Sequence, residues 1–448
     1  MSMKTPVCDF VRDYGEKQTL RLHMPGHKGK SLLGMEDRDL TEIPGADDLY
    51  DPQGILAQSE KNASALFGCP TYYSTEGASQ CVRGMLYLAM LDAKAKGLTP
   101  RIAAGRNAHK TFLTAAALLD VEVSWLYPPA DSSYLSCVIK PAELEAALTA
   151  MDPKPTAVYV TSPDYLGHVT DIQGLAKVCH RHGLLLLVDN AHGAYLRFLP
   201  QSRFPMDLGA DLCCSSAHKT LPVLTGGAYL HLSADFEKAY GHQVKSGMAL
   251  FGSTSPSYLI LQSLDAANAY LAALKETLAV FLPKVAALKS RLVSQGYVLL
   301  GDEPMKLCLS CKPYGYTGKD FADALAQLGI IAEFFDPDYV VLMPTPQLDD
   351  RDLDRLTSAL LSIPQKTPIQ EAPPRLQPGQ QVCPLRQAAL GLSKIVPVEE
   401  SLGCILANTG IGCPPAVPIL VCGERIDEHA IRCFRYYGIE KVSIIDEK

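Results

Sequence analysis

From about residue 100, short apolar runs alternate along the chain with segments whose apolar residues recur at helical spacing. Strands that alternate with helices predict a parallel, doubly wound sheet with helices on both faces, and the uniformly apolar run 184–188 fits a strand buried on both faces. The fold class that we predict is therefore α/β, with a mainly parallel sheet in a large domain. The predicted strands are RIAAG (101–105), VEVSWLY (121–127), TAVYVTS (156–162), LLLLVDN (184–190) and DLCCSSA (211–217), and the predicted helices between them lie at 109–120, 141–151 and 175–183.

The length of the chain, 448 residues, exceeds what one hydrophobic core supports, since single cores stop growing at roughly 250–300 residues. A second α/β pattern begins after residue 280 with a long helix, and a stretch dense in Pro and Gln, which is typical of a linker, follows it. We predict five parts: an N-terminal arm (1–60), a large α/β domain (61–280), a smaller α/β domain (281–363), a linker (364–381) and a C-terminal domain (382–448).

Composition and charge argue against several classes of partner. The sequence has no apolar run near the roughly 18 residues that a membrane span needs, and its N-terminus lacks the apolar region that follows the basic start of a secretion signal. A cytoplasmic protein that does not bind membranes is expected. The net charge of −7, with 41 basic residues spread evenly along the chain, argues against nucleic acid as a partner.

Fourteen cysteines are scattered through the chain, which without a signal peptide is typical of reduced thiols. Cys308 and Cys311 form a CxxC pair, but they lie in the alternating stretch MKLCLSC without a second pair, so we interpret them as part of a half-buried strand. His23 and His27 are four residues apart, but Pro25 between them excludes the helix that a metal-binding pair at this spacing needs. No metal site is therefore predicted.

Polar residues follow two of the predicted strands, at the ends where open parallel sheets bind ligands. Asp189 ends one strand and His192 comes shortly after it, while Ser216, His218 and Lys219 follow the other strand. Asp189 and Lys219 could form a buried salt bridge. The alternative is a cofactor site, in which Lys219 forms a Schiff base with pyridoxal phosphate and Asp189 keeps the pyridine nitrogen protonated, so that the ring accepts electrons.

A pyridoxal phosphate site makes two further demands, a cradle for the phosphate and a flat group against the ring. Helix N-termini bind anions through exposed N–H groups and the helix dipole, and residues 77–80 (GASQ) open a predicted helix. His109 follows the strand 101–105 and could stack on the ring, although a histidine that caps a helix is the simpler interpretation. The four features together predict that Lys219 is a catalytic amine.

Several specific motifs occur together in the chain: HMPGHKG, GADDLYDPQGI, GRNAHKT, DNAHGA, SSAHK, STSPSY and PPAVPILVCGE. In these motifs, which extend over most of its length, the sequence resembles the bacterial ornithine/lysine/arginine decarboxylases, which are fold-type I pyridoxal-phosphate enzymes. The resemblance is to the compact branch of the family, which lacks an N-terminal receiver-like domain. It implies a fold-type I large domain and a homo-oligomer, at least a dimer, with active sites shared between subunits.

The resemblance also implies which residues contact the cofactor. The chain departs from the family pattern in TEGAS, where Glu76 and Ala78 stand in place of the Asn and Thr common in relatives. The implied set is Lys219 (Schiff base), Asp189 (pyridine nitrogen), His109 (stacked on the ring), Ser216 and His218 (beside the lysine), Ser79 and Gln80 with the neighbouring Ala78 (phosphate), and Ser253 (phosphate, from a neighbouring subunit).

The function that the resemblance implies is α-decarboxylation of a basic amino acid (arginine, lysine or ornithine) to a polyamine-type amine and CO2, with His192 or Lys219 returning the proton to Cα. An aminotransferase or a carbon–sulfur lyase is the alternative, because the fold does not decide which bond breaks. A catalytically silent regulatory relative is a further alternative, against which the intact set Lys219, Asp189 and His109 argues. The arginines that could clamp a carboxylate in a transaminase are Arg355, Arg386, Arg425 and Arg432.

The distal cation of a basic substrate needs a carboxylate, and several acidic residues could supply it. Each of them could instead be a solvated turn carboxylate or a helix cap. Pocket length, which depends on residues far apart in the chain, decides among ornithine, lysine and arginine. The candidates for the substrate contact are Glu333, Asp336 and Glu424, with Asp47 and Asp48 as further ones.

Overall fold

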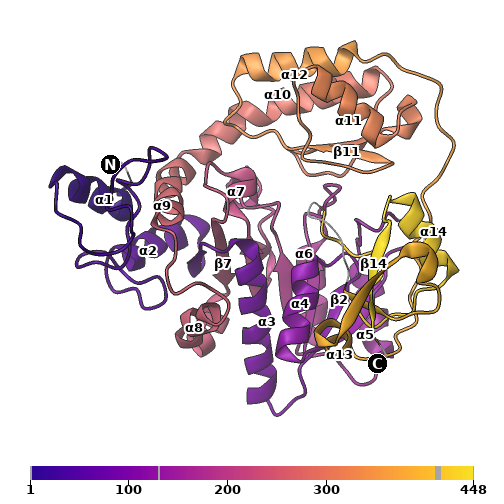
Figure 1. The fold of residues 1–448 in the computed structure, drawn as a ribbon, viewed down its shortest axis with the longest axis horizontal. Coiled ribbons are helices and arrows are strands. Elements are labelled where there is room, and N and C mark those ends of the chain that lie inside the picture. Colours follow the sequence, from indigo (N-terminus) through magenta and orange to yellow (C-terminus); the bar gives the residue numbers. More distant parts are fainter. Residues whose placement is uncertain (1–2, 130–131, 409–414, 447–448) are drawn as a thin grey trace. The chain divides into compact units, whose positions relative to one another are not determined.

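The computed structural model describes residues 3–129, 132–408 and 415–446 (Figure 1). The chain forms two compact units, each built from two separate stretches: unit 1 comprises Met1–Leu98 and Ile172–Ala279, and unit 2 comprises Thr99–Asp171 and Val280–Lys448. No helix in these described parts is long and apolar enough to cross a membrane. The division into five parts stays a prediction.

Unit 1 contains four strands in the order β1-β7-β6-β5. β5 and β6 are parallel, with Asp189 opposite Cys214, and β7 runs antiparallel to both β6 and β1. All residues of β5 after the first are buried, as predicted for an apolar strand covered on both faces. The elements are α1 (Pro6–Glu16), α2 (Ile55–Phe67), β1 (Thr71–Ser74), α3 (Gly77–Ala95), α6 (Ile172–Arg181), β5 (Leu185–Asp189), η1 (Leu196–Phe198), η2 (Pro205–Leu208), β6 (Leu212–Ser215), α7 (Ala217–Thr220), β7 (Ala228–Leu232), α8 (Ala234–Ala249), α9 (Tyr258–Ala272) and the start of α10 (Leu274–Ser294).

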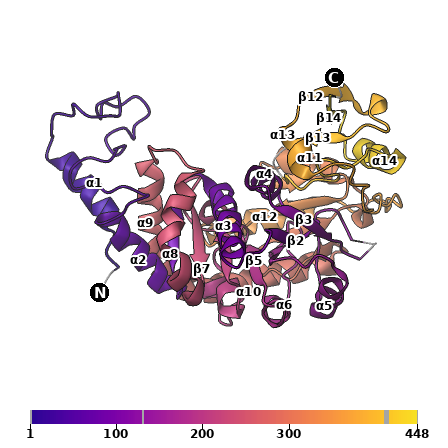
Figure 2. The ribbon, with the colours of Figure 1, turned by 90° about the horizontal axis from the view of Figure 1, so that it is seen from below.

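The direction of the strands in unit 1 brings three chain segments to one edge of the sheet. β1, β5 and β6 all run opposite to β7, so their carboxyl ends lie at the same edge. The first residues after these strands are 75–80, 190–192 and 216–219, which hold most of the predicted site residues. α3 starts at this edge and packs across β1, β6 and β7 (Figure 1, Figure 2).

Unit 2 contains three groups of strands. β2 pairs in parallel with β3 and β4, whereas the sheets β10-β11-β9-β8 and β12-β14-β13 are antiparallel. With unit 1, these strands confirm the α/β fold class and all five strands that the sequence predicts. The elements are β2 (Arg101–Gly105), α4 (Lys110–Leu119), β3 (Glu122–Leu126), α5 (Pro141–Ala150), β4 (Ala157–Thr161), β8 (Val298–Leu300), β9 (Leu307–Ser310), η3 (Lys312–Tyr314), α11 (Gly318–Gln327), β10 (Phe334–Phe335), β11 (Tyr339–Leu342), α12 (Asp350–Ser362), α13 (Leu385–Leu390), β12 (Ser393–Pro397), η4 (Val398–Glu400), β13 (Leu406–Asn408), α14 (Glu428–Tyr436) and β14 (Lys441–Ile445).

The CxxC pair belongs to the smaller antiparallel sheet. Cys308 lies in β9, Cys311 follows that strand, and both side chains are buried and free. Burial raises the pKa of the Cys308 thiol to about 12, so the thiol stays protonated. Among the described residues, no group of three or more His, Cys, Asp or Glu side chains could hold a metal ion. The burial of both thiols is consistent with a structural role for Cys308 and Cys311 in the packing of this sheet.

Candidate active site

Lys219 lies in α7, the short helix that directly follows β6, and its amine is held by a histidine. Lys219 Nζ is 3.0 Å from Nε2 of His192, which follows the neighbouring strand β5 and is buried. Within the described chain, Lys219 Nζ makes this contact and no ion pair with Asp189. The buried Asp189–Lys219 salt bridge that the sequence left open is therefore not formed, and the pair that forms is an amine and an imidazole.

Asp189 is the last residue of β5 and is 3% exposed. Its Oδ1 accepts a hydrogen bond from the N–H of Ala191 at 3.1 Å and one from the thiol of Cys214 at 3.5 Å. The turn that follows requires a glycine, because a Cβ at Gly193 would lie 2.0 Å from Oδ1 of Asn190. The motif DNAHGA thus forms a tight turn that places a buried carboxylate and His192 at the same strand end.

The start of α3 offers backbone N–H groups without a side-chain cap. Glu76 occupies the N-cap position and its side chain makes no capping hydrogen bond. The first N–H groups of a helix have no acceptor within the helix and favour an anion. Ser79 lies in this first turn, partly exposed, next to Ala78.

A glycine pair connects this helix start to the lysine segment. The N–H of Gly77 donates to the carbonyl of Gly226 at 2.7 Å, and the N–H and Nδ1 of His218 lie 3.2 and 3.0 Å from the carbonyl of Gly227. Gly226 has a φ of +99°, and a Cβ there would lie 2.8 Å from the carbonyl oxygen of Thr75, so the close approach needs glycine. The segment 226–227 therefore holds the two helix starts together.

The side-chain amide of Gln80 is already hydrogen-bonded within the protein and is not available to donate to a phosphate at the start of α3. It is fully buried; its amide oxygen accepts from Ser74 Oγ at 2.6 Å, and its nitrogen donates to Tyr50 Oη at 2.8 Å and to the carbonyl of Met248 at 2.9 Å. These bonds use both amide hydrogens, so we expect Gln80 to contribute only its backbone N–H to an anion. The neighbouring Gly252 packs on this amide, where a Cβ would lie 2.2 Å from its nitrogen.

Three further residues of the predicted site, Ser216, Ser253 and His109, make local hydrogen bonds within their own turns. Ser216 is the buried N-cap residue of α7, and its carbonyl accepts from the N–H of Lys219. Ser253 is exposed, and its hydroxyl accepts from the N–H of Ser255 at 3.1 Å. His109 belongs to unit 2 and caps α4, since its Nδ1 accepts from the N–H of Thr111 at 3.1 Å. The cap fixes the orientation of the ring; its stacking on a cofactor stays a prediction.

The three carboxylates predicted to bind a distal cation all lie in unit 2, in different environments. Asp336 is buried, accepts N–H bonds from Asp338 and Tyr339, and has its pKa raised to about 7 by burial. Glu424 is 1% exposed and lies 3.5 Å from Arg106. Glu333 is exposed and accepts from the Tyr165 hydroxyl at 3.2 Å. Of the three, only Glu333 presents an exposed carboxylate.

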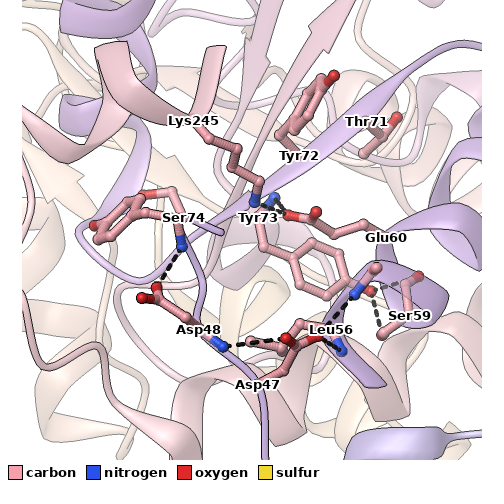
Figure 3. Close-up of polar contacts among 12 residues, drawn as sticks. Asp47, Asp48, Leu56, Ser59, Glu60, Thr71, Tyr72, Tyr73, Ser74 and Lys245 are labelled. Atoms are coloured by element: carbon pink, nitrogen blue, oxygen red, sulfur yellow. Dashed lines mark hydrogen bonds and ion pairs between the residues drawn. The ribbon is translucent and has the colours of Figure 1, made fainter. Parts of the chain in front are cut away.

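Asp47, a further candidate from the sequence, is a helix cap. It is buried and accepts from the N–H groups of Gly54 and Leu56 at 2.8 and 3.0 Å, at the start of α2 (Figure 3). The Tyr258 hydroxyl donates to its carbonyl. Such a carboxylate stabilises the helix N-terminus. The contacts of Asp47 are therefore those of a helix cap, the alternative to a substrate contact that the sequence left open.

Comparisons with known proteins identify relatives over nearly the whole chain. The sequence model of the Orn/Lys/Arg decarboxylase major domain matches residues 5–292. An arginine decarboxylase of Bacillus subtilis is 29% identical over 96% of this chain and 92% of its own length, and one of Halalkalibacterium halodurans is 27% identical over 96% and 93%. The lysine decarboxylase of Francisella novicida has a similar fold, with a TM-score of 0.77, 16% identity and coverage of 99% of this chain and 81% of that one. This chain is a member of the Orn/Lys/Arg decarboxylase family.

Proposed function

We propose that this protein removes the α-carboxylate of a basic amino acid, arginine first among the candidates, with pyridoxal phosphate as its cofactor. The products are a polyamine-type amine and CO2. The observation that carries the proposal is the paired amine and imidazole of Lys219 and His192 at the strand edge that also holds the buried Asp189. Arginine comes first because two of the relatives that match nearly the full chain are named arginine decarboxylases.

The residues present fit pyridoxal phosphate at three points. The amine of Lys219 is hydrogen-bonded to a histidine and not locked in an ion pair with a carboxylate. The start of α3 lacks a side-chain cap and suits a phosphate. Asp189 supplies a buried carboxylate, which suits the protonated nitrogen of a pyridine ring. In the proposal, the ring of His109 stacks on the pyridine ring. Ser79 and Ser253 offer hydroxyl groups to the phosphate, and Ser216 offers one beside Lys219.

In this proposal, each residue of the site has a separate role. When bound, pyridoxal phosphate supplies an electron sink for the bond that breaks at Cα. Asp189 holds a proton at the ring nitrogen through a charge-assisted hydrogen bond. His192, whose Nε2 lies 3.0 Å from Lys219 Nζ, moves protons to and from that amine, and either residue returns a proton to Cα. Glu333 is our first choice for the distal cation of the substrate.

Direct assay of the three basic amino acids tests this function. We expect the purified protein, supplied with pyridoxal phosphate, to release CO2 and the corresponding amine from arginine, and to leave leucine and glutamate unchanged. Mass spectrometry of the amine and capture of CO2 measure both products. A keto acid as the main product would make the enzyme a transaminase and refute the decarboxylase proposal.

We further propose that the protein is a cytoplasmic homo-oligomer, at least a dimer, in which the N-terminal arm contacts a second copy. The arm exposes several large apolar side chains, including Leu20 (81%), Leu22 (83%), Leu32 (87%) and Leu33 (77%). Apolar side chains gathered on one exposed segment are typical of an interaction surface.

The variant Leu22→Asp, combined with Leu33→Asp, is expected to weaken self-association at least about tenfold, because charges would be buried without partners. Light scattering over a range of protein concentrations measures the effect. Val293→Asp, at a 57% exposed position of α10, is the matched control and should leave the assembly unchanged. A wild-type monomer with full activity at assay concentrations would contradict the proposal.

A further inference from the structure

Cys214 contacts the carboxylate that we assign to the cofactor ring. It lies in β6 directly opposite Asp189 of β5, and its side chain is completely buried. Its Sγ is 3.5 Å from Asp189 Oδ1, the oxygen that also accepts the N–H of Ala191. Oδ1 therefore accepts from its own turn and from the neighbouring strand.

The thiol of Cys214 stays protonated, so it always has a hydrogen to donate to Asp189. Burial, and then the nearby charge of Asp189, raise its pKa well above the ordinary value for a cysteine. Burial, and then the nearby Cys69 and Asp189, raise the pKa of Cys213 in the same direction. Since a protonated thiol has one hydrogen to give and the thiolate form is suppressed, Cys214 adds no second negative charge beside Asp189.

We propose that Cys214 is a positioning residue that fixes the rotation of the Asp189 carboxylate about its Cβ–Cγ bond. With Oδ1 held by two donors, the plane of the carboxylate is set, and its direction toward a ring nitrogen is set with it. This inference rests on the proposed function, because it assigns to the thiol the task of orienting the carboxylate that serves the cofactor. Partners of this kind, which orient a functional group without touching substrate, commonly change activity when removed.

Two substitutions separate hydrogen bonding from packing. Cys214→Val keeps a buried apolar side chain, one methyl group larger, and removes the donor. Cys214→Ser keeps a donor and reduces the volume. Cys213→Val is the matched control, because Cys213 is equally buried, its side chain leaves the strand on the opposite face, and its Sγ lies 3.7 Å from the carbonyl of Cys214.

We expect Cys214→Val to lower kcat about tenfold with KM within about twofold, and Cys214→Ser and Cys213→Val to keep kcat within about threefold of wild type. Equal losses in Cys214→Val and Cys214→Ser, or an unchanged kcat in Cys214→Val, would overturn the positioning role. A wild-type protein that neither binds the cofactor nor releases CO2 would overturn the proposed function, and this inference with it.

Infrared difference spectra of the cofactor-free protein give a readout that does not depend on turnover. The S–H stretching band from wild type minus Cys214→Val is expected at a lower frequency than the band from wild type minus Cys213→Val, because a thiol that donates to a carboxylate has a weaker S–H bond. Coincident bands would show that the thiol makes no special bond to Asp189 and would refute the inference even if the enzyme is an active decarboxylase.

Discussion

Replacement of Lys219 by alanine is expected to lower decarboxylation at least about a thousandfold, because in the proposed function its amine captures the cofactor's aldehyde and no other side chain at this strand edge offers an amine. The variant is also expected to lose the visible absorption band of a cofactor bound to a lysine amine. Lys61→Ala, which removes an exposed lysine from α2, is the matched control and should keep both the band and the activity. Absorption spectra after dialysis and single-turnover assays measure the two effects.

Borohydride reduction of the wild type followed by peptide mapping tests the same assignment independently. Reduction converts the link between cofactor and lysine into a stable bond, so the labelled peptide should contain Lys219. A label on another lysine, or normal turnover in Lys219→Ala, would remove Lys219 from its proposed role.

Replacement of Arg106 by alanine is expected to lower the free energy of unfolding by about 3–5 kcal/mol. Arg106 is 1% exposed, and it donates to the carbonyls of Pro418 and Ile419 at 2.8 and 2.9 Å and lies 3.5 Å from Glu424. Its loss leaves these two carbonyls without this donor and leaves the buried carboxylate of Glu424, which still accepts from the N–H of Val421 at 2.7 Å, without a positive charge beside it. Urea unfolding followed by the fluorescence of Trp125, the only tryptophan, measures the change, since the guanidinium lies 5.4 Å from that ring.

Two further variants test whether the cost comes from an unpaired buried charge. Arg106→Met combined with Glu424→Leu removes both charges and is expected to recover part of the lost stability. Arg101→Met, at the start of the strand β2 that Arg106 follows, breaks the ion pair with the largely exposed Glu122 and should cost no more than about 1 kcal/mol. Equal losses in Arg106→Ala and Arg101→Met would contradict the role of the buried pair.

The sequence predicts the strands and the residues at their ends because both follow from local patterns. The uniformly apolar run 184–188 predicts β5, and Asp189 and Lys219 follow directly from where two strands end. β1 and β7 were not predicted. Both stand between helices, as the predicted strands do, but TYYS contains no aliphatic residue and AYLHL is interrupted by a histidine, so neither is a uniformly apolar run.

The contacts of individual site residues could not be predicted because their partners are distant in the chain. The amide of Gln80 is used by Tyr50 and Met248, which are 30 and 168 positions away. A pattern of residues 77–80 alone predicts a phosphate contact and contains no information on these bonds. The pair of Arg106 and Glu424 could not be predicted either, because the two residues are 318 positions apart and no local pattern connects them. The bond from Cys214 to Asp189 depends on the pairing of β5 with β6.

The division of the chain into two interleaved units has a consequence for the order in which it folds during synthesis. Unit 1 needs both its stretches, and the last strand of its sheet, β7, ends at Leu232, so its sheet can close only after about that residue has left the ribosome. The whole segment from Thr99 to Asp171 is synthesised before then, although its own unit is completed only by residues after Val280. Within unit 1, β1 therefore waits longest for its partner β7, and slow translation between residues 75 and 228 would prolong the time during which its unpaired edges are open to aggregation.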